Sequence, residues 1–124
     1  MPNPLTFGKE QKLCGQLRIN NLYAQGKNFV CYPLRVTCMK VSGAAANQIL
    51  VWAPKKLFKR AVKRNRLRRL MREAYRLNAE TLETWSVENN CRFQVAFNYL
   101  APDELPYHVV EKAMKKALSK ITEV

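Results

Sequence analysis

Residues 59 to 76, KRAVKRNRLRRLMREAYR, place the strongest constraint on how this chain can fold. They contain nine Lys and Arg residues and a single acid, Glu73. A run of like charges this dense is ordinarily disordered, yet apolar residues such as Leu67, Leu70 and Met71 recur through it at helical spacing. The stretch is therefore predicted to be a helix that packs one apolar stripe on a folded scaffold.

This helix is expected to span about residues 58 to 82. Its core-facing residues fall within an arc of about 120° at 100° per residue. They are Leu67, Leu70, Met71, Ala74, Leu77 and Asn78. Basic residues cover the rest, and Glu73 is the only acid for which Arg69 and Arg76 compete, so ion pairs within the helix cannot neutralise this surface. Arg outnumbers Lys by six to one from Lys63 to Arg76, and the planar guanidinium suits bidentate contact with phosphate.

Charge is concentrated in one segment of the chain. The net charge is +13, and residues 55 to 76 hold eleven of the 22 basic residues and one of the nine acids. An excess this local implies an anionic partner, most commonly a nucleic acid. The 124 residues and the 48% apolar fraction suit a single domain over residues 1–124.

Cellular location and redox state follow from other patterns. No apolar run approaches the ~20 residues that span a bilayer, and the N-terminal residues lack a signal-peptide pattern. Four cysteines are spaced without a CxxC pair: Cys14, Cys31, Cys38 and Cys91. This spacing favours reduced, mostly buried thiols in a cytoplasmic protein over zinc ligands or a disulfide framework.

Before the basic stretch, the sequence predicts one helix and two strands. The helix runs from about Gln16 to Gln25, with Gly26 as its stop. The strands are residues 34–41, after Pro33, and QILVW before Pro54, joined by a turn at SGAAAN.

After the basic stretch, a loop near residues 89–90 precedes a strand and a final helix. In the strand CRFQVAFNYL, one face carries Cys91, Phe93, Val95, Phe97 and Tyr99. The last helix, about residues 107–123, has a buried stripe of Val110, Ala113, Met114, Ala117, Leu118 and Ile121. Helices alternating with strands predict an α/β (α+β) two-layer sandwich, with a sheet against helices.

The basic stretch also resembles the RNR motif of the bacterial ribonuclease P protein component, roughly A-V-x-R-N-R-x-K/R-R-x-x-R-E. The matching residues are Ala61, Val62, Arg64, Asn65, Arg66, Arg68, Arg69, Arg72 and Glu73. The likeness covers nearly the whole chain: KLCGQLRINNLYAQGK is similar to the family's first helix, APKKLFKRAV to its loop before the basic helix, and EKAMKKALSK to its last helix.

The resemblance implies an α-β-β-β-α-β-α fold with a left-handed crossover around the basic helix, like domain 2 of ribosomal protein S5. It requires a third strand before that helix, for which residues 29–32 are the candidate. It also implies a ribonuclease P subunit that binds the catalytic RNA and the precursor-tRNA 5′ leader, and assists endonucleolytic removal of that leader. The RNA and its Mg²⁺ ions would carry the chemistry, with one protein per RNA, in the cytoplasm, and with neither a catalytic side chain nor a tightly bound metal on the protein.

Two sets of site residues follow from the matched positions. The set expected to bind the catalytic RNA is Lys55, Lys56, Lys59, Arg60, Lys63, Arg64, Asn65, Arg66, Arg68, Arg69 and Arg72. The leader-binding cleft, between the first helix and the sheet, would be lined by Ile19, Tyr23, Arg35 and Thr37. The family often has an aromatic residue at the position of Ile19, so Tyr23 is the expected base-stacking residue, with ordinary core packing as its alternative.

Three other functions fit parts of the sequence. A self-sufficient nuclease would need catalytic groups, but His108 is the only histidine and the acids form no cluster suited to a two-metal site. A generic RNA-binding or ribosome-associated basic protein fits the charge equally well, and only the motif argues against it. A membrane-surface helix would need the apolar arc that the core already uses.

Overall fold

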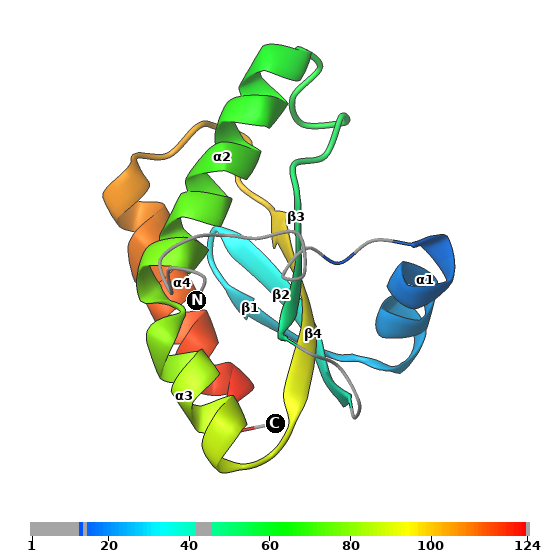
Figure 1. Cartoon of the computed structure of the whole chain (residues 1–124). Coiled ribbons are helices and arrows are strands. Elements are labelled where there is room, and N and C mark those ends of the chain that lie inside the picture. Colours follow the sequence, from blue (N-terminus) through cyan, green and yellow to red (C-terminus); the bar gives the residue numbers. More distant parts are fainter. Residues whose placement is uncertain (1–12, 14, 42–45, 124) are drawn as a thin grey trace.

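The computed structural model describes residues 13, 15–41 and 46–123 (Figure 1). Their elements are α1 (Gln16–Gln25), β1 (Lys27–Cys31), β2 (Leu34–Val41), β3 (Gln48–Trp52), α2 (Ala61–Asn78), α3 (Glu80–Glu88), β4 (Arg92–Tyr99) and α4 (Tyr107–Ile121). The fold is α+β, as predicted. The strand β1 is the third strand that the resemblance required before the basic helix, and it covers the candidate segment except for Tyr32.

The four strands form one mixed sheet in the order β1-β2-β4-β3. β2 pairs antiparallel with both β1 and β4, whereas β3 pairs parallel with β4. Parallel neighbours need a crossover connection, and here that connection consists of α2 and α3. The basic helix therefore lies in the link between two strands that are adjacent in space.

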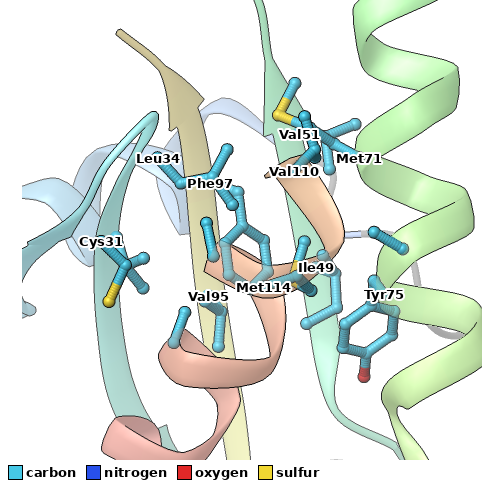
Figure 2. Close-up of a cluster of buried hydrophobic side chains, with 14 of the residues drawn as sticks. Cys31, Leu34, Ile49, Val51, Met71, Tyr75, Val95, Phe97, Val110 and Met114 are labelled. Atoms are coloured by element: carbon cyan, nitrogen blue, oxygen red, sulfur yellow. The ribbon is translucent and has the colours of Figure 1, made fainter. Parts of the chain in front are cut away.

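The main core lies between one face of the sheet and the helices α2, α3 and α4 (Figure 1). On β4, Phe93, Val95, Phe97 and Tyr99 are fully buried, as their alternation predicted. Figure 2 shows Phe97 and Val95 surrounded by side chains from the neighbouring strands, from α2 and from α4. The predicted stripe of α4 is confirmed throughout, since all of its members are buried: Val110, Ala113, Met114, Ala117, Leu118 and Ile121.

The opposite face of the sheet is covered only in part, by α1 (Figure 1). Leu22 of α1 is fully buried there against Ala96 of β4 and Leu13. The helix ends at Gly26, whose N–H donates to the carbonyl oxygen of Leu22 at 2.7 Å. A Cβ at Gly26 would lie 2.5 Å from that oxygen and 2.9 Å from Cγ2 of Thr37, so this close approach of α1 to β2 requires glycine.

The prediction of a single helix over about residues 58–82 is wrong about both of its ends. α2 begins three residues later, at Ala61, because Phe58 is buried in the core and holds the preceding loop out of the helix. It ends at Asn78, and α3 starts after Ala79. The side-chain amide of Asn78 donates to the carbonyl oxygen of Ala74 at 2.8 Å and to Oε2 of Glu111 on α4 at 3.2 Å. These bonds complete the last turn and attach it to α4.

The stripe predicted for the basic helix is also partly wrong. Leu67, Met71 and Ala74 are fully buried, whereas Leu77 leaves 43% of its surface exposed. Tyr75 is buried in its place, and its hydroxyl donates to Oε1 of Glu83 on α3 at 3.3 Å. The stripe turns toward Tyr75 because the chain bends into α3 immediately afterwards.

The expected burial of the cysteines holds for the described thiols. Cys31 and Cys38 are buried and Cys91 is half-buried. Burial raises the pKa of the Cys38 thiol to about 11. Cys14 and most of the expected SGAAAN turn lie outside the described residues. Within the described part of the chain, no helix has the length and hydropathy to cross a membrane.

Candidate nucleic-acid interface

The basic surface starts in the loop that follows β3. The N–H groups of Leu57 and Phe58 both donate to the carbonyl oxygen of Pro54, at 3.2 and 3.1 Å. The ring of Phe58 packs against Tyr99 with 5.7 Å between centroids. This buried anchor leaves the four basic residues of the loop exposed: Lys55, Lys56, Lys59 and Arg60.

Arg64 connects this loop to the first turn of α2. Its Nη1 donates to the carbonyl oxygens of Phe58, at 2.8 Å, and Lys59, at 2.9 Å. Hydrogen bonds from a charged donor contribute more to stability than those between neutral groups. The structure therefore gives Arg64 a positioning role within the loop, which its place in the motif did not indicate.

Most of the basic surface lacks acidic partners. In the described residues, only Arg66 and Arg76 of the eleven basic residues from Lys55 to Arg76 lie within 4.0 Å of a carboxylate. Nη1 of Arg66 lies 3.6 Å from Oε1 of Glu104. Glu73 pairs with Arg76, whose Nε donates to Oε2 at 3.1 Å, and this hydrogen bond lowers the pKa of Glu73 below its usual 4.5.

The start of α2 adds backbone donors to this surface. Arg60 precedes the helix in an extended conformation, without a side-chain cap among the described residues, and the first turn contains no acid. The first N–H groups of a helix have no partner within it, and the positive end of the helix dipole lies there. With Lys63 and Arg64 in the same turn, an anion would offset a local excess of positive charge. Figure 1 shows these first turns rising past the end of the sheet.

A second candidate surface is a groove of about 650 Å³ between α1 and the sheet. The four residues predicted for the leader cleft all line it: Ile19, Tyr23, Arg35 and Thr37. Ile19 and Tyr23 come from α1, and Arg35 and Thr37 from β2. The structure thus brings together residues that the sequence separates by up to 18 positions.

Polar side chains that line the groove form hydrogen bonds with one another. Nδ2 of Asn98 donates to the hydroxyl of Tyr23 at 3.2 Å, which joins α1 to β4. The hydroxyl of Thr37 donates to Oδ1 of Asn28 at 2.5 Å. Tyr23 leaves 43% of its surface exposed, so it is not an ordinary core residue, whereas Thr37 is 1% exposed and offers little surface.

The motif-based prediction missed eight of the residues that line the groove, among them Asn28, Trp52 and Asn98. Trp52 is 47% exposed. The alternation of β3 gives a signal for it, because Ile49 and Val51 face the core and Trp52 must face the other way. Only the strand order shows that this other face opens into the groove.

A mixed sheet with an arginine-rich helix in its crossover, next to an open groove, defines a small basic protein of the polyanion-binding class. The family model described as Ribonuclease P matches residues 7–122 of the chain. The ribonuclease P protein component of Porphyromonas gingivalis strain ATCC 33277 is 45% identical over 126 residues, which cover 98% of this chain and 91% of the relative. The component from strain W83 is 44% identical over the same coverage.

Two solved structures share the fold at low sequence identity. The ribonuclease P protein of Thermotoga maritima has a TM-score of 0.73 at 17% identity, covering 89% of this chain and 96% of that one. The Staphylococcus aureus protein has a TM-score of 0.70 at 17% identity, covering 92% and 96%.

The chain belongs to the ribonuclease P protein family. It is accordingly a protein subunit of the endoribonuclease that processes tRNA 5′ ends, and it associates with ribonuclease P RNA. Membership decides between this role and the generic basic protein that the charge alone left open. In the described residues, no group of three or more His, Cys, Asp or Glu side chains is placed to hold a metal ion.

Proposed function

We propose that the surface of α2 and its preceding loop binds the catalytic RNA, while the groove beside α1 binds the single-stranded 5′ leader of precursor tRNA. The observation that carries this division is the different chemistry of two neighbouring surfaces. One consists mostly of cations without carboxylate partners, and the other has rings and amides around a single cation, Arg35. We propose one protein per catalytic RNA, acting in the cytoplasm.

The cationic surface suits a folded RNA. Nine of its basic residues have no carboxylate within 4.0 Å among the described residues. They include Arg68, Arg69 and Arg72, at the helical spacing that presents them together. Asn65 accepts a hydrogen bond from Nη2 of Arg68 and so orients its guanidinium. Arg contacts phosphate through two donors in one plane, so an array of this kind follows a sugar–phosphate backbone.

The groove suits an unpaired strand. The groove lies between α1 and an open face of the sheet, and Tyr23 presents a partly exposed ring there. Unpaired bases stack on such rings without a strong sequence preference. Precursor and mature tRNA differ by the leader, so a protein that holds the leader raises the affinity for substrate over product.

The chemistry of cleavage is proposed to belong to the RNA. The described side chains form no cluster of metal ligands. The Mg²⁺ ions of the reaction are expected to be held by the catalytic RNA. The protein contributes binding and orientation of the substrate, which lower the Mg²⁺ concentration needed for assembly.

The test is precursor-tRNA cleavage at low Mg²⁺ by a bacterial ribonuclease P RNA with and without the protein. Cleavage is expected only with both components. Arg69→Ala with Arg72→Ala should weaken assembly with the RNA, whereas Tyr23→Ala should mainly reduce the preference for precursor over mature tRNA. Lys115→Ala with Lys116→Ala on α4 is the matched control for loss of charge.

Distinct results would contradict each part of the proposal. If the Lys115 and Lys116 control weakens assembly as much as the α2 double variant, net charge binds the RNA and the α2 surface is not special. Equal losses of precursor and mature tRNA affinity on Tyr23→Ala would remove the leader from the groove. Cleavage by the protein alone would place catalytic groups on the protein after all.

A further inference from the structure

We propose that the groove recognises the bases of the leader rather than its phosphates, and that Trp52 is a residue on which a base stacks. This inference rests on the proposed leader binding in the groove. It assigns a role to a side chain that the family motif does not include, and it predicts which part of each nucleotide contacts the protein.

Charge is the first argument. Among the described residues that line the groove, Arg35 is the only charged one. It has no carboxylate within 4.0 Å among those residues. A site that followed the phosphates of several nucleotides would need several cations. The neighbouring α2 surface has them, so the protein has separated the two kinds of contact, and the groove can neutralise about one phosphate.

The strand register is the second argument. Arg35 of β2 is the direct partner of Asn98 on β4, and Asn98 is the direct partner of Trp52 on β3. All three line the groove. Adjacent strands are about 4.8 Å apart, so the backbone of Arg35 lies roughly 10 Å from that of Trp52. A base stacked on the indole would therefore have amide and guanidinium groups beside its edge.

The surroundings of Trp52 are the third argument. Its strand neighbours Ile49 and Val51 are buried in the main core, on the other face of β3. The buried cluster under α1 includes Leu50 at its margin but not Trp52. An indole that stays 47% exposed on an edge strand leaves apolar area in water, and a stacked base would cover it.

Trp52 also lies where the two proposed surfaces meet. Lys55 and Lys56 follow it by three and four residues, in the exposed loop that leads to α2. Tyr23 is hydrogen-bonded to Asn98, the register partner of Trp52. A strand that enters over Tyr23 and leaves over Trp52 would pass directly from a nearly neutral surface to the cationic one.

The experiment compares the affinity of the assembled holoenzyme for mature tRNA and for cleavage-resistant precursors. One precursor has an unmodified leader, one has abasic leader nucleotides, and one has a leader with methylphosphonate linkages in place of phosphates. The unmodified and the uncharged leaders should raise affinity over mature tRNA, and the abasic leader should not. Trp52→Ala should lower the precursor-to-mature affinity ratio on the order of tenfold. Trp52→Phe, which keeps a ring, should retain most of that ratio, and Val87→Ala, an exposed apolar control on α3, should retain all of it.

Salt provides an independent readout. With a single phosphate contact, the precursor-to-mature ratio should change by only about threefold between 50 and 200 mM salt, although affinity for the RNA as a whole changes far more. If the uncharged leader loses the added affinity, or Trp52→Ala leaves the ratio intact, this proposal is overturned, whatever the abasic leader does. If the unmodified leader itself adds no affinity, the proposed leader binding fails, and this inference fails with it.

Discussion

Nη1 of Arg64 lies 2.8 Å from the carbonyl oxygen of Phe58 and ties the first turn of α2 to the loop before it. Phe58 is buried, so this bond extends from the core to the exposed basic loop. A residue of the RNR motif therefore also fixes the position of the lysines around it. Loss of its charge and loss of this bond are separate effects, and a variant at this position combines them.

Arg64→Ala is expected to lower RNA affinity more than Arg69→Ala, because it frees the loop as well as removing one cation. Local opening of residues 55–60 should become easier by roughly 1.5–3 kcal/mol, the range for a hydrogen bond to a charged donor. Hydrogen exchange of the loop amides and RNA titration measure the two effects. Arg64→Lys keeps the charge and should restore little of the protection, since Lys lacks the fixed fork of donors. Unchanged exchange in Arg64→Ala would refute the positioning role.

Glu104→Gln is expected to tighten binding to the catalytic RNA by about two- to fivefold. The carboxylate lies 3.6 Å from Arg66, whose side chain is 61% exposed, and exposed pairs of this kind contribute up to about 1 kcal/mol. Removing the acid makes that cation available to phosphate. Glu88→Gln on α3 removes the same charge away from this pair and serves as the control in the same titration. An equal gain from both variants would show that only net charge changed.

The pair of Glu73 and Arg76 has a defined pH dependence. The hydrogen bond from Arg76 lowers the folded-state pKa of Glu73 below 4.5. A lowered carboxyl pKa means that the contribution to stability is fully present above pH 4.5 and is lost as pH falls through the folded-state value. Carboxyl ¹³C NMR should show the Glu73 pKa rising toward 4.5 in Arg76→Gln. The same pKa should stay low in Arg69→Gln, and a rise there would mean that Arg69 shares the pairing.

Asn47→Ala is expected to destabilise the fold by roughly 2–4 kcal/mol, because it leaves buried groups without partners. Oδ1 of Asn47 accepts from the N–H of Phe93 at 2.8 Å, and Nδ2 donates to Oγ of Ser86 at 3.1 Å. The side chain thereby joins the start of β3 to α3 and β4. Urea unfolding measures the loss. Asn89→Ala, at an exposed site with one bond to the carbonyl of Trp85, should cost much less, and similar losses would argue against the buried network.

Local pattern predicted most element boundaries. Alternation located β2, β3 and β4, and helical spacing predicted every residue of the buried stripe of α4. Strand β1 has little alternation of its own, with Lys27 and Asn28 exposed, so only the family resemblance indicated it. Where α2 ends, Asn78 donates to Glu111 across 33 residues, and a contact at that sequence separation has no signature in local periodicity.

The site residues also fall into two groups, those that sequence patterns or the family resemblance predicted and those that only the three-dimensional contacts reveal. The basic residues were found because they lie together in sequence, and Tyr23, Arg35 and Thr37 were found through the family's known cleft. Trp52 and Asn98 were missed because they meet Arg35 only through the order β2-β4-β3. The bond from Arg64 to the loop depends on where Phe58 enters the core, which the positions of charged residues do not reveal.

The parallel pairing of β3 with β4 has a consequence for the protein before it meets its RNA. The densely basic segment that includes α2 connects these two strands in sequence, so it must fold back over the sheet before β3 can pair with β4. A polyanion that binds only the folded form shifts the folding equilibrium by mass action. RNA bound to the folded form is therefore expected to stabilise the fold as well, so the free protein should unfold more easily than the RNA-bound protein.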